Sequence, residues 1–288
     1  MIWISDQWKD YEVLDTSDGE RLERWGKYIL VRPDPQVIWN TPHTAPEWKR
    51  YDARYLRSNT GGGRWTDHNL PERWQIKYRD YLTFNVKPMN FKHTGVFPEQ
   101  AANWDFIREK CANAGRPVKV LNMFAYSGGA TLAAAAGGAE VWHVDAAKNM
   151  VAWAKENAQA SGLADKPIHW IVDDCAKFIQ REIRRGRRYD GIIMDPPSYG
   201  RGPSGEIWKR ETSFYPFLLE VAKILSDDPL FVIINSYTTG LAPSAVGYAS
   251  DVVFGEVAGG HTTVGELGLP VRESGLMLPC GSTGRWTP

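Results

Sequence analysis

The chain has 288 residues, 43% of them apolar, and its 34 Lys and Arg residues balance its 34 Asp and Glu residues. This length suffices to bury one large α/β core and a smaller appended module. The balanced charge excludes any argument from overall charge for a polyanionic partner, which would need a locally basic face. The three cysteines, Cys111, Cys175 and Cys280, fit neither a disulfide framework nor a metal cluster, so we expect no metal.

The N-terminus does not resemble an export signal. No basic segment followed by an apolar stretch opens the chain, and no window approaches the run of about 18 apolar residues that a membrane helix needs. We therefore expect a cytoplasmic protein that does not enter a membrane.

Residues 1–92 are predicted to form a small β-rich N-terminal domain. Residues 28–31 and 81–86 alternate between apolar and polar side chains, which indicates strands. Four prolines and the run Gly61-Gly62-Gly63 interrupt the sequence between them and predict turns.

Residues 93–288 are predicted to form a second domain, in which strands and helices alternate. The predicted strands are 118–124, 140–144, 168–172, 190–194 and 230–235, and the predicted helices are 99–113, 130–136, 149–161, 176–185 and 214–225. This alternation predicts an α/β fold with a doubly wound, mostly parallel sheet and a ligand site at the carboxyl ends of its strands. Two more strands around Gly275, within 262–286, are predicted to form an edge hairpin.

The first strand of this second domain leads into a turn of small residues, Tyr126-Ser127-Gly128-Gly129. Glycines let a backbone approach a ligand closely, and the N-terminus of the next helix offers N–H donors. An ordinary turn that requires glycine is the alternative interpretation. The turn is not GxGxxG, and the chain has no GxxxxGK[ST], so neither a nicotinamide dinucleotide nor a phosphate loop is favoured.

Carboxylates follow the next two strands. Asp145 stands sixteen residues beyond Gly129, where it can accept both hydroxyls of a ribose, although a helix N-cap would use the same residue type. Asp173 and Asp174 follow the third strand, where one carboxylate could accept the exocyclic amine of an adenine. Capping of the helix that follows is the alternative for one of the pair.

The fourth strand ends in Asp195-Pro196-Pro197-Ser198-Tyr199. Two prolines fix the backbone and remove two N–H donors, so the carbonyls and the Asp195 carboxylate act as acceptors. Such a turn suits a sulfonium cation or an amine that must be oriented. A proline-stiffened loop without a ligand is the alternative.

These four segments, in this order, resemble the motifs of class I S-adenosylmethionine-dependent methyltransferases, which have a Rossmann-like fold. They are most similar to the branch of bacterial large-subunit ribosomal RNA methyltransferases that modify cytosine C5 or guanine N7. Residues 93–100 resemble that branch's Thr-Gly-x-Phe-x-Asp-Gln segment, with Glu99 in place of Asp and Ala101 in place of the usual basic residue. The resemblance covers about residues 80–288 and implies S-adenosylmethionine as cofactor, S-adenosylhomocysteine as product, and no metal.

The resemblance also implies roles for individual residues. Ser127 to Gly129 would pass the methionine moiety, Asp145 would hold the ribose, and Asp174 would meet the adenine amine. The implied cofactor-binding set is Thr94, Phe97, Gln100, Phe124, Ala125, Tyr126, Ser127, Gly128, Gly129, Asp145, Ala146, Asp173, Asp174, Cys175 and Asp195. The implied catalytic set at the transfer site is Asp195, Pro196, Pro197, Ser198 and Tyr199.

RNA is the favoured acceptor. The stretch between Trp48 and Lys92 carries ten basic residues against four acidic ones. Aromatic residues lie among them, namely Tyr51, Tyr55, Trp65, Trp74 and Tyr78. Positive charge binds phosphates and flat rings stack on unpaired bases, which predicts an RNA partner. The resemblance implies that this partner is ribosomal RNA. A solvated face over a Trp-rich core is the alternative. A second basic run, 181–188, is predicted at an exposed helix end, where complementing the helix dipole is the simplest interpretation of its charge.

Other acceptors remain open from the sequence. Methylation of a cytosine carbon needs a covalent thiolate, but Ser198 occupies the usual place of that cysteine, and Cys280 qualifies only if the tail folds over the pocket. A small molecule or a protein side chain is the second hypothesis, with residues 200–207 as the acceptor wall. A non-catalytic RNA-binding module on the same fold is the third.

Overall fold

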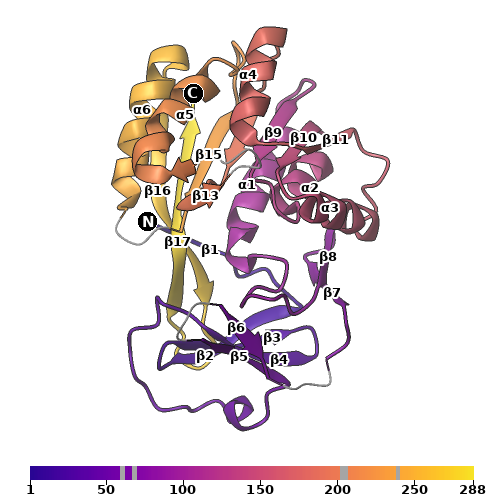
Figure 1. The fold of residues 1–288 in the computed structure, drawn as a ribbon, viewed down its shortest axis with the longest axis vertical. Helices are drawn as coiled ribbons and strands as arrows, with labels where there is room; N and C mark the ends of the chain where they lie inside the picture. The colour runs from indigo at the N-terminus through magenta and orange to yellow at the C-terminus, as the bar shows by residue number, and fades with distance from the viewer. Residues whose placement is uncertain (59–61, 67–69, 202–206, 238–240) are drawn as a thin grey trace. The chain divides into compact units, whose positions relative to one another are not determined.

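The computed structural model describes residues 1–58, 62–66, 70–201, 207–237 and 241–288, which form two compact units. The first unit comprises Met1–Trp3, Ala102–Leu267 and Gly281–Pro288, and the second comprises Ile4–Ala101 and Gly268–Cys280. Figure 1 follows the chain through both. This division groups 93–101 and 268–280 with the N-terminal part, whereas the sequence predicts one boundary after residue 92.

An eight-stranded sheet carries the parallel strands of the first unit, in the order β1-β16-β17-β15-β12-β9-β10-β11. Five neighbouring strands are parallel, namely β9 (Lys119–Met123), β10 (Glu140–Asp145), β11 (Ile168–Val172), β12 (Gly191–Met194) and β15 (Phe231–Ser236). The sheet also contains β1 (Ile2–Ile4), β16 (His261–Pro270) and β17 (Met277–Thr287), the last antiparallel to β15. The two tail strands were predicted at an edge, which is wrong because β17 lies inside the sheet between β15 and β16.

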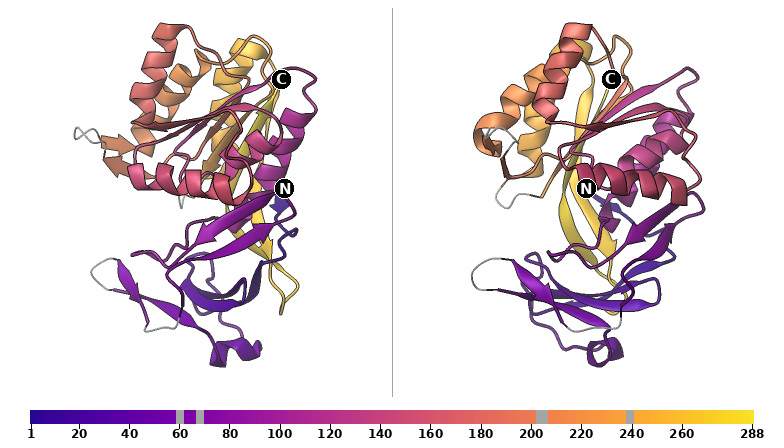
Figure 2. Two further views of the ribbon diagram at one scale, coloured as in Figure 1. Left: turned by 90° about the vertical axis from the view of Figure 1, so that its right-hand side faces the viewer. Right: turned by 45° about the vertical axis from the view of Figure 1, so that its right-hand side comes forward.

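Helices cover both faces of this sheet (Figures 1 and 2). One face carries α1 (Ala101–Ala112), α2 (Gly129–Ala136) and α3 (Lys148–Ala160), and the other carries α4 (Cys175–Arg185), α5 (Arg210–Ala222) and α6 (Pro243–Ala258). The predicted doubly wound, mostly parallel α/β fold is confirmed. The structure differs from the prediction at two helices. The helix α5 spans Arg210–Ala222 instead of the predicted 214–225, and α6 was not predicted.

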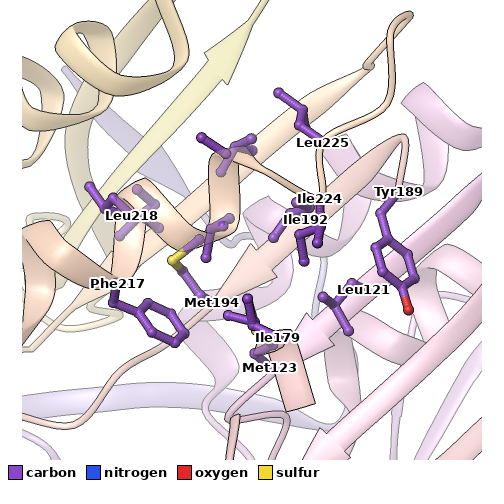
Figure 3. Close-up of a cluster of buried hydrophobic side chains, with 14 of the residues drawn as sticks. Leu121, Met123, Ile179, Tyr189, Ile192, Met194, Phe217, Leu218, Ile224 and Leu225 are labelled. Atoms are coloured by element: carbon purple, nitrogen blue, oxygen red, sulfur yellow. The ribbon is translucent and has the colours of Figure 1, made fainter. Parts of the chain in front are cut away.

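Side chains of the parallel strands alternate between the two helical layers, as the pleat requires. Leu121 and Met123 pack with Ile179 of α4 and Phe217 and Leu218 of α5 in a buried apolar cluster (Figure 3). The residue between them, Asn122, points to the opposite layer, where its amide donates to Thr131 Oγ1 of α2 at 2.9 Å. The same hydroxyl lies 2.9 Å from His143 Nδ1, so a buried polar chain joins α2 to β9 and β10.

The second unit is β-rich, as predicted. Its five-stranded sheet has the order β2 (Tyr11–Ser17), β3 (Glu20–Trp25), β4 (Tyr28–Pro33), β5 (Ala53–Arg57) and β6 (Gly63–Trp65). A separate hairpin joins β7 (Trp74–Tyr78) to β8 (Leu82–Val86), and two short 3-10 helices span Pro46–Lys49 and Pro98–Gln100. Burial would raise the pKa of Glu23, but Arg21 and Arg32 beside it lower that pKa to about 2.

No helix in the described part of the chain is long and apolar enough to cross a membrane.

Candidate functional site

The switch point of the sheet lies between β9 and β12. From β9 the chain continues through β10 to β11 on one side, whereas β12 and β15 stand on the other side. In open α/β sheets, ligands bind outside the carboxyl ends of the strands at such a point. The turns after β9 and β12 are therefore the first candidates for a binding site, and both were singled out from the sequence.

The turn after β9 holds an unusual backbone. Phe124 and Tyr126 have φ of 53° and 49°, and Gly128 has φ of 91°. Each such residue other than glycine costs about 1–3 kcal/mol and persists only where its surroundings enforce it, as ligand sites often do. Here the Phe124 N–H donates to Cys175 Sγ at 3.4 Å, and the Tyr126 N–H donates to Asp145 Oδ2 at 2.8 Å. Acceptors at the end of β10 and at the start of α4 therefore hold the shape of this turn.

Gly129 begins α2 and lies against the ring of Trp104 from α1. A Cβ at this position would stand 2.5 Å from Trp104 Cζ2, and Trp104 is itself buried. The close approach explains why glycine stands at the start of this helix. Gly129 therefore serves the packing of α2 against α1, in addition to any role in ligand binding.

We expect Gly129→Ala to lower the free energy of unfolding by about 1–3 kcal/mol, because the added methyl group overpacks a site that cannot expand. Denaturant unfolding measures this loss. The matched control is Gly255→Ala in α6, where a Cβ would meet nothing within 4 Å. That change should stabilise the protein by up to about 1 kcal/mol through helix propensity. Equal stability of wild type and Gly129→Ala would contradict the packing argument.

Asp145 ends β10 and ties two turns together. Its Oδ2 accepts the Tyr126 N–H, and its Oδ1 accepts the Ala147 N–H at 2.8 Å. The N-cap of α3 is Ala147, so the alternative interpretation of Asp145 as a helix cap is wrong. Burial raises the pKa of the Asp145 carboxyl, and these two N–H groups act in the opposite direction. Each carboxylate oxygen can accept about two hydrogen bonds, which leaves capacity for two ligand hydroxyls.

Asp173 and Asp174 have separate structural roles. Asp174 is the N-cap of α4, and its Oδ1 accepts the Lys177 N–H at 3.0 Å, which confirms the capping alternative for this residue. Asp173 forms an ion pair with Arg181. Cys175 is buried, and burial raises the pKa of its thiol, so it packs beneath Phe124 in the protonated form. Asp145, Asp173 and Cys175 thus meet beside the turn after β9, with Ala146 exposed next to them.

The turn after β12 is held by an aromatic residue that the sequence did not single out. Pro196 is buried and Asp195 half-buried, whereas Pro197, Ser198 and Tyr199 are exposed. The indole N–H of Trp208 donates to the Pro197 carbonyl at 2.7 Å. The centre of the Trp208 ring lies 5.8 Å from that of Phe124, so Trp208 connects the turn after β12 with the turn after β9.

Trp208 belongs to a small hairpin of β13 (Tyr199–Arg201) and β14 (Ile207–Lys209). No composition bias or spacing marks this residue, and the pairing of Gly200 with Trp208 brings it to the turn. The loop 200–207, expected as an acceptor wall, supplies the two strands of the hairpin at its ends. Its central residues 202–206 lie outside the described residues.

A groove of about 790 Å³ opens between α4 and α5, beside this hairpin. We call it the α4–α5 groove, and its walls include Lys177, Arg181, Arg184, Trp208 and Phe217. Asp174, at the start of α4, also borders it. The groove therefore reaches one residue predicted to bind the cofactor, Asp174, and the aromatic residue that holds the turn after β12.

Three residues predicted to bind the cofactor, Thr94, Phe97 and Gln100, belong to the second unit. Thr94 and Gln100 are buried, and the Phe97 ring packs edge-on against His93. Among the described residues, Thr94 Oγ1 and Glu99 Oε2 are buried without a hydrogen-bond partner. The part of these residues in cofactor binding stays a prediction.

The basic and the aromatic residues between Trp48 and Lys92 differ in their exposure to solvent. Most of their cations are exposed, whereas Tyr55 and Tyr78 are buried. The indoles of Trp65 and Trp74 donate to the carbonyls of Met89 and Trp25, at 2.9 and 3.0 Å. The segment therefore offers charge for phosphates more readily than rings for bases. In the described part of the chain, no cluster of three or more His, Cys, Asp or Glu side chains is placed to hold a metal ion.

Known proteins are similar to this chain in both sequence and fold. A family model described as S-adenosylmethionine-dependent methyltransferase matches residues 36–213. A crystal structure of the SAM-dependent methyltransferase from Agrobacterium tumefaciens is 36% identical with a TM-score of 0.93, over 100% of this chain and 93% of that chain. A putative SAM-dependent methyltransferase from Streptococcus mutans, 19% identical with a TM-score of 0.73, covers 98% of this chain and 76% of its own and shares the fold.

Curated relatives match a shorter part of the chain. The ribosomal RNA large subunit methyltransferase K/L of Chromohalobacter salexigens is 30% identical over 171 residues, and that of Shewanella baltica is 33% identical over 117 residues. These matches cover 57% and 40% of this chain but 21% and 16% of the relatives, so the chain spans about a fifth of their length. Because the family model matches more than half of the residues and the Agrobacterium tumefaciens protein is similar over almost its whole length, the chain belongs to the S-adenosylmethionine-dependent methyltransferase family.

Proposed function

We propose that this chain transfers a methyl group from S-adenosylmethionine to a base in RNA, with ribosomal RNA favoured. The observation that carries the cofactor half is the Asp145 carboxylate, held by the Tyr126 and Ala147 N–H groups beside the strained turn after β9. A carboxylate fixed in this place matches the ribose-binding acid of dinucleotide folds. The relatives named as ribosomal RNA large subunit methyltransferases support the RNA half.

The residues around the switch point would share the work of binding. Ser127 to Gly129 would lie along the methionine moiety, Asp145 would accept the ribose hydroxyls, and the second carboxylate oxygen of Asp174 would accept the adenine amine. S-adenosylmethionine supplies an electrophilic methyl group on a sulfonium that is already a good leaving group. The protein then has to align the acceptor and exclude water, and such positioning is worth up to about 7–11 kcal/mol.

The turn Asp195 to Tyr199 would orient the acceptor. Its prolines offer carbonyls but no N–H groups, and the Pro197 carbonyl is already bound by Trp208. The Asp195 carboxylate would accept a hydrogen bond from an amino group or ring N–H of the base. In this role Asp195 would be the catalytic residue that accepts a hydrogen bond from the base. The exposed Ser198 and Tyr199 would contact the same base.

A nitrogen acceptor fits this chain better than a carbon acceptor. Carbon methylation needs a thiolate that first attacks the ring. Burial, and secondarily the charge of Glu99, raise the pKa of Cys280 well above the ordinary value, and its Sγ lies 3.3 Å from the Leu278 carbonyl. A thiol held in its protonated form is a poor nucleophile.

We therefore expect Cys280→Ser to keep the methylation rate within about twofold of wild type, since a thiol held in its protonated form supplies no nucleophile. The rate of transfer of a labelled methyl group to total RNA measures this. Cys111→Ser, at a buried cysteine, controls for the general cost of the exchange. Loss of activity in the Cys280 variant alone, at equal stability, would favour carbon methylation instead.

Mass spectrometry of the nucleosides in total RNA, from cells with and without the gene, tests the proposed function. We expect one methylated nucleoside to be lost with the gene and restored by the wild-type gene, but not by the Asp145→Ala gene. Unchanged nucleosides, together with methyl transfer to a protein or small-molecule fraction, would contradict the RNA assignment. Absence of any heat on titration with S-adenosylmethionine would favour a non-catalytic module.

A further inference from the structure

The exposed face of α4 concentrates positive charge along the α4–α5 groove. Lys177, Arg181 and Arg184 all line the groove, while Phe178 and Glu182 on the opposite face are buried. The spacing of four and then three residues places the three cations in one row on the helix. At a rise of about 1.5 Å per residue, the row extends over roughly 10 Å.

The structure separates this row from the rest of the basic run at 181–188. Arg185 and Arg187 donate to the buried Glu182 carboxylate at 2.9 and 3.1 Å, and Arg188 donates to the carbonyls of Lys223 and Leu225. Arg185 and Arg187 therefore stabilise the end of α4, and Arg188 ties the following loop to the end of α5. In the described part of the chain, Arg184 has no such ion-pair partner and stands in the groove wall.

The opposite wall of the groove is aromatic. Trp208 and Phe217 meet edge to face, with ring centres 5.3 Å apart and an interplanar angle of 89°. Trp208 is half-buried and fixed by its bond to the Pro197 carbonyl, so its ring borders both the groove and the turn after β12.

The carboxylates around the groove are already engaged. Asp174 caps α4, Asp173 pairs with Arg181, and Glu220 binds Lys223 and Gln180 at 2.6 and 2.7 Å. These carboxylates keep their charge, but the groove walls carry three cations, Lys177, Arg181 and Arg184, against Asp174 and Glu220, and this excess of positive charge favours an anion over a cationic ligand.

We propose that the α4–α5 groove holds the nucleotide next to the methylated base, with its phosphates at Lys177, Arg181 and Arg184 and its base against Trp208. This inference rests on the proposed function. It places the RNA next to the methylated base in the α4–α5 groove. A row of cations facing a flat ring is the arrangement that binds single-stranded nucleic acid. The volume of about 790 Å³ lies within the range of about 300–1,000 Å³ that small-ligand pockets occupy, so one nucleotide fits.

The double variant Lys177→Gln, Arg184→Gln tests the groove. Filter binding of a short single-stranded RNA of mixed sequence, over a series of salt concentrations, should show affinity about 2- to 30-fold below wild type, the range of two exposed ion contacts. The slope of log affinity against log salt should fall by about 1.4, because each phosphate contact on a single strand contributes about 0.7. With the cognate RNA, KM should rise, whereas kcat at saturating RNA and the Kd for S-adenosylmethionine should stay at their wild-type values.

The control removes the same charge elsewhere on the first unit. Lys155→Gln, Lys166→Gln changes two exposed lysines on and after α3, and should leave the salt slope at its wild-type value. A wild-type slope and KM in the groove variant, with wild-type methylation of RNA intact, would overturn the groove alone. A loss of S-adenosylmethionine affinity equal to the loss of RNA affinity would also overturn it, because the groove would then serve the cofactor. Failure of the wild-type protein to bind and methylate RNA would remove the proposed function itself.

Discussion

Asp145→Ala is expected to abolish measurable binding of S-adenosylmethionine while the fold remains intact. A carboxylate that accepts two hydroxyls makes two charge-assisted hydrogen bonds, each worth about 1.5–3 kcal/mol. Their loss corresponds to a decrease in affinity of at least about 100-fold. The substitution also removes the acceptor that holds the Tyr126 N–H in the strained turn after β9, so the turn loses part of its preorganisation. Isothermal titration measures the affinity, and thermal unfolding reports on the fold.

Two further variants separate charge from geometry. Asp165→Ala removes an exposed carboxylate in the turn before β11 and should bind the cofactor as wild type does. Asp145→Asn keeps one acceptor oxygen and should bind weakly, with little dependence on pH. In wild type, burial raises the pKa of Asp145, so affinity should weaken as pH falls towards that raised value and the carboxylate gains a proton. Wild-type affinity in a folded Asp145→Ala protein would remove the ribose assignment.

The parallel core could be predicted because its signals are local. Residues 168–172 form β11 with the predicted bounds, since an apolar run between a proline and two acidic residues admits few other structures. The helix α6 gives no such signal. Its sequence holds Gly247 and Gly255 and several β-branched residues, which are poor helix formers, so packing of Val246, Val253 and Phe254 into the core stabilises it instead.

The sequence does not predict which segments of the chain form the second unit, because contacts between residues far apart in the sequence determine this. Val271 bridges to Val13, and Arg272 pairs with Glu47 across 225 residues of sequence. Nothing near Val271 in the chain specifies that partner. The single boundary after residue 92 came from a local change in pattern, and such a change does not reveal that the tail returns.

The candidate site was predictable to the extent that strand ends specify it. Asp145 and the turn after β9 meet because their strands are neighbours and parallel, a relation that alternation of elements implies. The engagement of Asp174 as a cap was recognised only as an alternative, since a ligand acid and an N-cap have the same sequence signature. Trp208 was missed because its place depends on the β13–β14 pairing, for which 199–209 shows no alternation.

Asp195→Asn should lower kcat for RNA methylation by about 100-fold or more, the usual range for a positioned group that accepts a proton or hydrogen bond at the reacting atom. The exchange keeps the volume of the side chain and the buried Pro196 beside it, so the turn should keep its shape. Affinity for S-adenosylmethionine should change far less than kcat, since Asp145 and the turn after β9 would carry most of the cofactor contacts. Single-turnover rates with saturating RNA and cofactor measure the chemical step directly.

The same exchange at an exposed site, Asp227→Asn in the loop before β15, should leave every one of these values unchanged. The split between kcat and Kd decides what Asp195 does. If the affinity for cofactor fell as much as kcat, Asp195 would be a cofactor ligand and the acceptor would need another partner, with the exposed Ser198 and Tyr199 the next to test. If neither value changed, the proline turn would hold Trp208 in place and take no part in transfer. A loss confined to kcat is the result that a group aligned with the acceptor requires, because such a group stabilises the transition state more than the bound ground state.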